Sequence, residues 1–303
     1  MRNSRYGARA ITRWLAVLLA TAVMPAAVSA GSCLVDNPAV LRNLEYRGIL
    51  DGAVTLRDGV YEGIPFVPEG ASRPRVTFVD TAPVLHDVDG DGTDEASVLL
   101  AESSGGSGVF TYLAVVACRG DRAVNVGTAL LGDRVMIRSL TGRDGAILVE
   151  MVAAGPGDPL CCPTRKVRNE YRVRDGKLLP ASPEEQGTVS VADLEGAAWR
   201  LVRLGREERV PEGVKVTAVF EDSKVSGSGG CNRYSAAVAS KGPLEISIGP
   251  AASTRMACPG PAGEFEQRYL SALQAANRFG FHLGDLVLHY RKGETVGTMR
   301  FER

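Results

Sequence analysis

The residues best suited to chemistry form an acidic loop, Asp87-Val88-Asp89-Gly90-Asp91-Gly92-Thr93-Asp94-Glu95. Carboxylates stand at its first, third, fifth and ninth positions, a glycine stands at the sixth, and the seventh can offer a backbone carbonyl. Hard oxygen ligands at this spacing suit Ca²⁺. The spacing therefore predicts a calcium site formed by Asp87, Asp89, Asp91, Thr93 and Glu95.

The loop departs from the EF-hand pattern, which needs a glutamate at the twelfth position and a helix on each side. Val98 stands at the twelfth position, and the flanking residues show no helical pattern. The loop is more similar to the strand-flanked calcium loop of FG-GAP repeats, whose ninth position is usually Asp. An acidic turn without metal is the alternative, because Asp and Gly favour turns by themselves.

Two adjacent cysteines, Cys161 and Cys162, could carry redox chemistry. A bond between them closes a strained eight-membered ring, and strained disulfides are the more easily reduced ones. Both could instead bond elsewhere, since together with Cys33 and Cys118 they permit three pairings. The sequence does not choose among these pairings.

The sequence offers few other arrangements of catalytic residues. The chain has three histidines and contains neither a G-x-S-x-G elbow nor an H-E-x-x-H helix. Its two glycine-rich stretches, 103–108 and 226–230, lack the following helix or the Lys-Ser/Thr pair of a phosphate-binding loop. We therefore expect a protein without catalytic activity.

Composition and charge place the chain among exported globular proteins. Residues 1–30 carry four arginines and no acid, so the remainder has 31 bases against 35 acids and no excess charge for nucleic acid. A basic start, an apolar run over Trp14–Met24 and the small residues Val28-Ser29-Ala30 predict a cleaved signal peptide. The mature chain has no apolar stretch long enough to span a bilayer.

The periplasm or cell envelope is the expected location. A lipid anchor at Cys33 is the alternative, although a lipoprotein signal would place a branched aliphatic residue where Ala30 stands. Cleavage after Ala30 leaves six cysteines in the mature chain, and an even number in an oxidising compartment favours disulfides.

The elements that position these residues are mostly short strands. In the expected N-terminal domain, residues 31–184, turns of the Asp-Gly type follow Val109–Cys118 and separate later strands. Residues 167–174 alternate between Val167, Asn169, Tyr171 and Val173 on one face and charged residues on the other, as in a half-buried strand. One short helix is expected over Pro38–Tyr46, and Pro180–Val191 is the expected linker.

The second domain, residues 185–303, is expected to combine a sheet with one helix. Strands are predicted over Trp199–Leu204, Lys215–Glu221, Asp285–Tyr290 and Thr298–Glu302. Apolar residues at helical spacing predict a helix over Phe265–Phe279 that ends at Gly280. The fold class predicted for the whole chain is strand-rich α+β.

Three blocks in this half resemble the META domain, the family of the heat-shock protein HslJ. They are Trp199-Arg200-Leu201, Ser226-Gly227-Ser228-Gly229-Gly230-Cys231-Asn232-Arg233-Tyr234 and Ser253-Thr254-Arg255-Met256-Ala257-Cys258-Pro259. The resemblance implies an antiparallel sheet or barrel packed on one helix, an envelope location and a role in stress tolerance without established catalysis.

The N-terminal half resembles segments that accompany META domains in proteobacterial envelope proteins. Leu131-Gly132-Asp133-Arg134-Val135 and Cys161-Cys162-Pro163-Thr164 carry this weaker likeness. It implies no activity.

Two features of the META-like blocks suggest roles for individual residues. Cys231 and Cys258 are interpreted as a structural disulfide, with a reactive thiol pair or two metal ligands as alternatives. Asn232 and Arg255 could form a surface binding patch, or they could organise the loops by hydrogen bonding.

The sequence thus predicts an exported, non-enzymatic envelope protein with a stress-tolerance, binding or structural role. Its partner is expected to be an envelope protein or a small ligand. Ca²⁺ is the candidate cofactor, with an acidic turn that binds no metal as the alternative. The alternative function is an envelope thiol–disulfide redox protein that uses Cys161 and Cys162.

Overall fold

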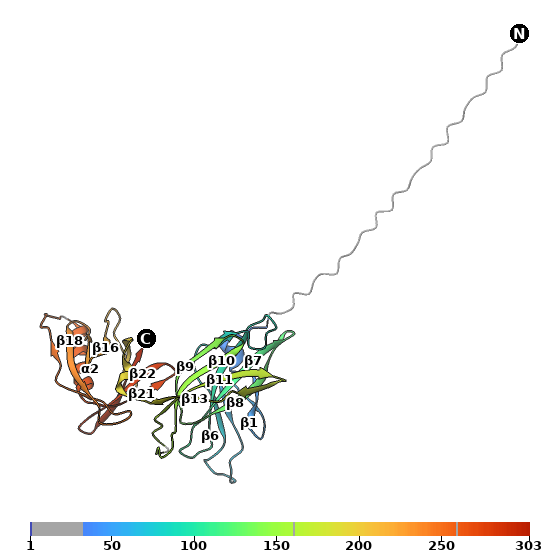
Figure 1. Cartoon of the computed structure of the whole chain (residues 1–303), viewed down its shortest axis with the longest axis horizontal. Coiled ribbons are helices and arrows are strands. Elements are labelled where there is room, and N and C mark those ends of the chain that lie inside the picture. Colours follow the sequence, from blue (N-terminus) through green and yellow to red (C-terminus); the bar gives the residue numbers. More distant parts are fainter. Residues whose placement is uncertain (2–32, 160, 259) are drawn as a thin grey trace. The chain divides into compact units, whose positions relative to one another are not determined.

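The computed structural model describes Met1 and residues 33–159, 161–258 and 260–303 (Figure 1). Apart from Met1, the predicted signal peptide therefore lies outside the described residues. Residues Cys33–Arg303 form one compact unit. Among the described helices, none combines the length and apolar character needed to cross a membrane.

The N-terminal part is built from antiparallel strands and one short helix. The helix is α1 (Pro38–Leu41). The strands are β1 (Glu45–Leu50), β2 (Gly52–Thr55), β3 (Val60–Glu62), β4 (Arg75–Phe78), β5 (Val84–His86), β6 (Glu95–Ser103), β7 (Phe110–Arg119), β8 (Arg122–Asp133), β9 (Met136–Arg143), β10 (Ala146–Ala153), β11 (Arg165–Arg174), β12 (Lys177–Pro180) and β13 (Glu184–Thr188).

These strands form a hairpin and two sheets. β1 pairs with β2. One sheet has the order β3-β4-β6-β7-β8, with β5 paired to β6, and the other has the order β12-β11-β10-β9, with β13 paired to β11. Both sheets are antiparallel meanders in which most neighbours in sequence are neighbours in space, as the closely spaced turns predict.

The first sheet is buried on both faces at its centre, so the consecutive residues Val98, Leu99 and Leu100 of β6 are all buried. Val98 and Leu100 pack into one core together with Tyr46 of β1. Leu99 points the other way and packs into a second core with Ile147 of the second sheet. Alternate residues of one strand thereby hold three layers together.

The predicted Asp-Gly turns form two-residue hairpins. Between β9 and β10, Asp144 and Gly145 have φ angles of 50° and 68°, and between β11 and β12 the same pair of angles recurs at Asp175 and Gly176. Positive φ at both central residues is the type I′ geometry, which matches the twist of the flanking strands. The predicted alternation on β11 is confirmed, since Val167 and Tyr171 are buried.

The C-terminal part combines a single sheet with one long helix, α2 (Pro261–Gln274), and a 3₁₀ turn at Val191–Leu194. Its strands are β14 (Ala198–Leu204), β15 (Glu208–Arg209), β16 (Thr217–Glu221), β17 (Lys224–Ser228), β18 (Arg233–Ala239), β19 (Ser247–Ile248), β20 (Ala252–Ser253), β21 (Ala276–His282), β22 (Asp285–Lys292) and β23 (Thr295–Glu302).

This sheet runs β19-β18-β17-β16-β14-β23-β22-β21 and nearly closes into a barrel. The ends approach each other where the amide of Phe279 donates to the carbonyl of Leu244 at 2.9 Å, and that of Ile246 donates to Asn277 at 3.3 Å. The helix α2 contributes Tyr269 to the same core as Trp199 of β14. The predicted sheet-plus-helix architecture is confirmed.

Three predicted elements differ from the structure. The long helix begins at Pro261 and ends at Gln274, so Gly280 lies inside β21 and does not cap a helix. The reason is that Phe279 and Phe281 are both buried in the barrel core and continue the sheet, which overrides the helical spacing.

The other two differences lie in the N-terminal part. The short helix stops at Leu41, and Tyr46 belongs to β1. The predicted linker, which has no hydrophobic periodicity, contains the strand β13. The backbone of β13 pairs with β11 at Thr188, Glu185 and Glu184. Backbone pairing of an exposed edge strand needs no apolar pattern, so the sequence did not reveal it.

Candidate functional site

The acidic loop connects β5 to β6, and its two ends face each other across this strand pair. His86, the last residue of β5, lies opposite Glu95, the first residue of β6. The register brings the ends of the loop together, so eight residues must turn tightly between them. Positive φ angles at Gly90 (82°) and Gly92 (86°) make this turn.

Aspartate side chains fold the loop by accepting hydrogen bonds from its own backbone. The two carboxylate oxygens of Asp87 accept from the amides of Gly90 at 2.7 Å and Gly92 at 3.0 Å. Asp89 accepts from the amide of Asp91, and Asp91 from the amide of Thr93. Such bonds are the usual reason that Asp is favoured in turns.

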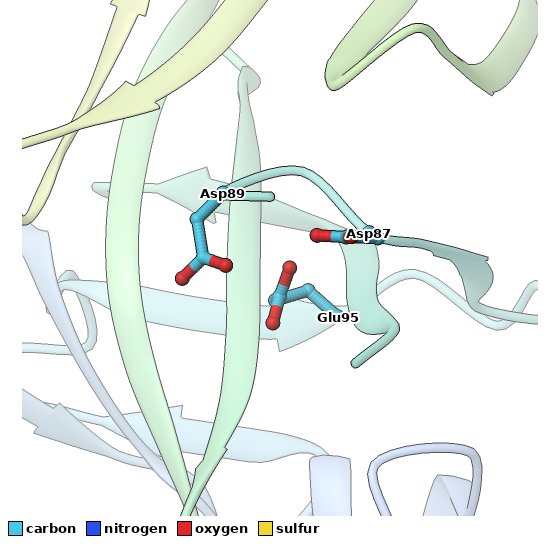
Figure 2. A group of neighbouring side chains, drawn as sticks. All are labelled: Asp87, Asp89 and Glu95. Atoms are coloured by element: carbon cyan, nitrogen blue, oxygen red, sulfur yellow. The ribbon is translucent and has the colours of Figure 1, made fainter. Parts of the chain in front are cut away.

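Three carboxylates converge inside the loop. One oxygen from each of Asp87, Asp89 and Glu95 lies within 4.8 Å of the others, and Figure 2 shows the three groups turned toward one another. Glu95 is only 1% exposed, and its Oε2 accepts a hydrogen bond from the amide of Val88 at 3.0 Å. The structure thus gathers three of the five predicted ligands.

The surroundings of Glu95 oppose its negative charge. Burial raises the pKa of its carboxyl group, and repulsion from Asp89, Asp91 and Asp87 raises it further, while the Val88 hydrogen bond acts in the opposite sense. A divalent cation among these oxygens would reverse the balance by attracting all of them.

The remaining two predicted ligands, Asp91 and Thr93, lie outside this group of three carboxylates. Asp91 is outside the group of three, and its carboxylate lies 3.9 Å from Nη1 of Arg119 on β7. The same guanidinium donates to Asp89 at 3.3 Å. Thr93 is exposed at the loop surface. Arg119 therefore supplies a positive charge at the rim of the loop, which the sequence did not predict because this residue lies 24 positions beyond Glu95.

The six cysteines form three pairs in the structure. Cys33 is bonded to Cys118, Cys231 to Cys258, and Cys161 to Cys162, with Cα–Cα distances of 5.8, 6.1 and 3.8 Å. This arrangement selects one of the three pairings that the sequence left open for the N-terminal four.

The adjacent pair lies in the connection between β10 and β11, which Asp158 organises. Its carboxylate accepts from the amides of Gly155 at 2.8 Å and Thr164 at 2.7 Å, and from the Thr164 hydroxyl. These hydrogen bonds, that of Gly155 first, lower the pKa of Asp158. Cys161 is exposed at the surface of this connection.

Asn232 lies at the centre of a buried polar network. Its Nδ2 donates to Oε1 of Glu266 on α2 at 2.8 Å, and its Oδ1 accepts from the Thr254 hydroxyl and the amide of Met256. Oε2 of Glu266 in turn accepts from the amides of Cys231 and Asn232. The network ties the two loops of the Cys231–Cys258 pair to the helix.

The two residues predicted to form a binding patch lie on neighbouring segments but differ in exposure. Asn232 is 6% exposed and fully engaged in this network, whereas Arg255 is exposed. The loop-organising alternative thus describes Asn232. Glu266 was not among the predicted site residues, although a carboxylate between the apolar residues Phe265 and Tyr269 of a predicted helix is a signal for a buried polar contact.

Comparisons with known proteins concern the C-terminal part of the chain. The sequence model of the META domain family matches residues 192–302. A solved structure, the NMR structure of a protein from Burkholderia xenovorans, is 28% identical over 41% of this chain and 98% of its own, with a TM-score of 0.32. No curated protein matches the chain. Residues 192–302 of this chain are a META domain.

Proposed function

We propose that this chain is an exported, non-enzymatic protein of the cell envelope in which a calcium-binding N-terminal domain is joined to the META domain. Its role is stress tolerance through binding or structural contact with an envelope protein or a small ligand. The observation that carries the calcium part is the convergence of Asp87, Asp89 and Glu95 within 4.8 Å around a buried carboxylate.

Calcium fits this group because all three side chains offer hard oxygen donors, and backbone carbonyls and water can complete the shell. Three carboxylates at short range repel one another, so each is more stable with a cation present. The single guanidinium of Arg119 contacts Asp89 and Asp91 at the rim and leaves Glu95 and Asp87 without a cationic partner among the described residues.

Thermal unfolding of the whole exported protein tests calcium binding. The melting temperature is measured in 1 mM CaCl₂, in chelator and in 1 mM MgCl₂. A ligand present at a hundred times its dissociation constant stabilises the folded state by about 2.7 kcal/mol. A calcium-specific rise that Glu95→Gln abolishes supports the site. Identical melting curves in calcium and chelator would show that the loop is an acidic turn without metal.

The three cysteine pairs support export, because disulfides persist in oxidising compartments. The Cys33–Cys118 pair also supports the form without a lipid, since a sulfur held in a disulfide is not available for a lipid thioether. Cell fractionation with mass spectrometry tests both points. Mature protein that begins at Gly31 in the periplasm is the expected result, and a lipidated Cys33 would contradict it.

A second candidate function is thiol–disulfide exchange by Cys161 and Cys162, favoured by their bond and by the exposure of Cys161. In this exchange a partner dithiol is oxidised to a disulfide as the Cys161–Cys162 bond is reduced to two thiols, and in the reverse direction the two thiols reduce a partner disulfide as their own bond re-forms. An insulin-reduction assay with thiol titration tests this, and Cys162→Ser should abolish any activity. Binding through Asn232 and Arg255 stays a prediction.

A further inference from the structure

A row of three arginines crosses three neighbouring strands of the META domain. Arg203 of β14 lies directly opposite Arg209 of β15 on one side and opposite Arg300 of β23 on the other. Residues directly opposite each other in an antiparallel pair share a face, with Cβ atoms about 5 Å apart. The three guanidinium groups therefore emerge from one face of the sheet.

Like charges placed directly opposite each other destabilise a sheet. Only part of this row is neutralised: Arg300 pairs with Asp285 of β22, whereas Arg203 donates to the carbonyl of Arg206. Among the residues that the structure describes, neither Arg203 nor Arg209 has a carboxylate oxygen within 4.0 Å. The row therefore carries an excess of positive charge.

The row lines a surface cavity of about 590 Å³. The connection after β15 forms its other wall through Val210, Val214 and Lys215. At Gly213 a Cβ would meet no atom within 4 Å, so this wall is open to a ligand. The one acidic lining residue, Glu302, is already paired with Arg200 at 2.6 Å.

The unpaired positive charges that line the cavity indicate which class of ligand it can bind. After the Arg200–Glu302 and Arg300–Asp285 pairs are set aside, Arg203, Arg209 and Lys215 leave three positive charges at the cavity. A carboxylate would neutralise one of them, whereas a phosphate monoester carries nearly two negative charges near neutral pH. Arginine forks also bind phosphate oxygens in a bidentate manner.

From this geometry we infer that the cavity between β14, β15 and β23 binds a phosphate group, carried by a soluble molecule or by a lipid headgroup. The inference is independent of the calcium site and of the Cys161–Cys162 pair, which lie outside the META domain. The bound phosphate supplies the counter-charge that the arginine row lacks.

Nuclear magnetic resonance of the ¹⁵N-labelled full mature chain tests this. Inorganic phosphate is titrated against sodium chloride of equal ionic strength. We expect saturable shifts of the Gly213 amide and of the Arg203 and Arg209 Nε–H groups, and a rise of at least tenfold in the dissociation constant for Arg209→Gln. The matched control is Lys224→Gln, which removes one charge from an exposed position on β17 and should leave the constant unchanged.

Co-sedimentation with vesicles identifies the source of the phosphate. Phosphatidylcholine vesicles with and without phosphatidic acid are compared for the same three proteins. Saturable binding of either inorganic phosphate or the vesicles supports the site if Arg209→Gln weakens that binding and Lys224→Gln leaves it unchanged. Retention on vesicles that contain phosphatidic acid assigns the site to lipid headgroups. The inference would be overturned if neither inorganic phosphate nor the vesicles bind saturably, or if the two variants lose binding equally.

Discussion

The backbone amide of Asn232 donates to Oε2 of Glu266 at 2.6 Å, across 34 positions of the chain. With the side-chain bond between the same residues at 2.8 Å, this contact joins the glycine-rich loop of the META domain to the buried face of α2. Gly229 stands beside it because a Cβ there would lie 2.8 Å from Glu266. The loop is thus organised from the helix.

Asn232→Ala should destabilise the protein substantially, because it removes the side-chain partner of Glu266 Oε1, of the Thr254 hydroxyl and of the Met256 amide. A buried polar group that loses its partner costs about 1–3 kcal/mol, so a loss of at least about 2 kcal/mol in the free energy of unfolding is expected. Urea unfolding measures it. Arg255→Ala is the control from the same block and should stay within about 0.5 kcal/mol. Equal stability of the two variants would show that the network contributes nothing.

Glu95→Gln should raise stability in calcium-free buffer at pH 7. The folded-state pKa of Glu95 is raised, so the unfolded chain loses this proton first and stability falls as the pH rises through the folded-state pKa. The glutamine variant lacks this loss, and the two proteins should converge at acidic pH. Melting curves measured against pH in chelator check it.

Calcium should reverse the order of these two proteins at pH 7. The wild-type chain gains stability by binding, and the gain grows with pH because the ion needs the ionised carboxylate. The matched control is Asp94→Asn, which removes a charge from an exposed position of the same loop outside the group of three. A calcium response retained by Glu95→Gln, or lost equally in Asp94→Asn, would contradict the assigned ligands.

The Cys231–Cys258 and Cys161–Cys162 disulfides, which close loops of very different length, should differ in their effect on stability. Cys231 and Cys258 are 27 positions apart, and the chain-entropy model gives roughly 3–4 kcal/mol for a loop of this size. The adjacent Cys161 and Cys162 constrain little chain, and about 1 kcal/mol is expected for their bond. Double serine variants, unfolded in urea without reductant, measure both. A larger loss from the adjacent pair would show that it holds tertiary structure.

Gly227→Ala should distort the barrel, since a Cβ at this position would lie 2.0 Å from the carbonyl oxygen of Thr217. Overpacking of this kind costs about 1–3 kcal/mol or more. At Gly242 the nearest atom would be 3.9 Å away, so Gly242→Ala is the control and should change stability little. Thermal unfolding compares the two, and equal melting temperatures would contradict the close approach of these strands.

Local patterns predicted much of the fold. The Asp-Gly dipeptides specified hairpins by themselves, because positive φ at Asp144 and Gly145 is a property of these residue types. The alternation around Val167 and Tyr171 likewise identified a half-buried strand. The helix end at Gln274 was not predictable in this way, because the residues that follow are recruited into β21 by partners on β22.

Among the candidate sites, too, those built from residues close together in the sequence could be predicted, and those built from distant residues could not. The acidic loop could be recognised because all of its predicted ligands lie within nine residues. Arg119 at its rim, Glu266 beneath Asn232 and the facing arginines Arg203 and Arg300 were not recognisable, since each contact joins residues far apart in the chain.

Composition and spacing by themselves determined the strand-rich class, the turns, the META-like blocks and the acidic loop, because short-range sterics and hydrogen bonding specify such features. The tertiary structure alone decided which cysteines meet, which carboxylate is buried and which arginines face each other. Register between strands settles those contacts, and register depends on the packing of a whole sheet against its core.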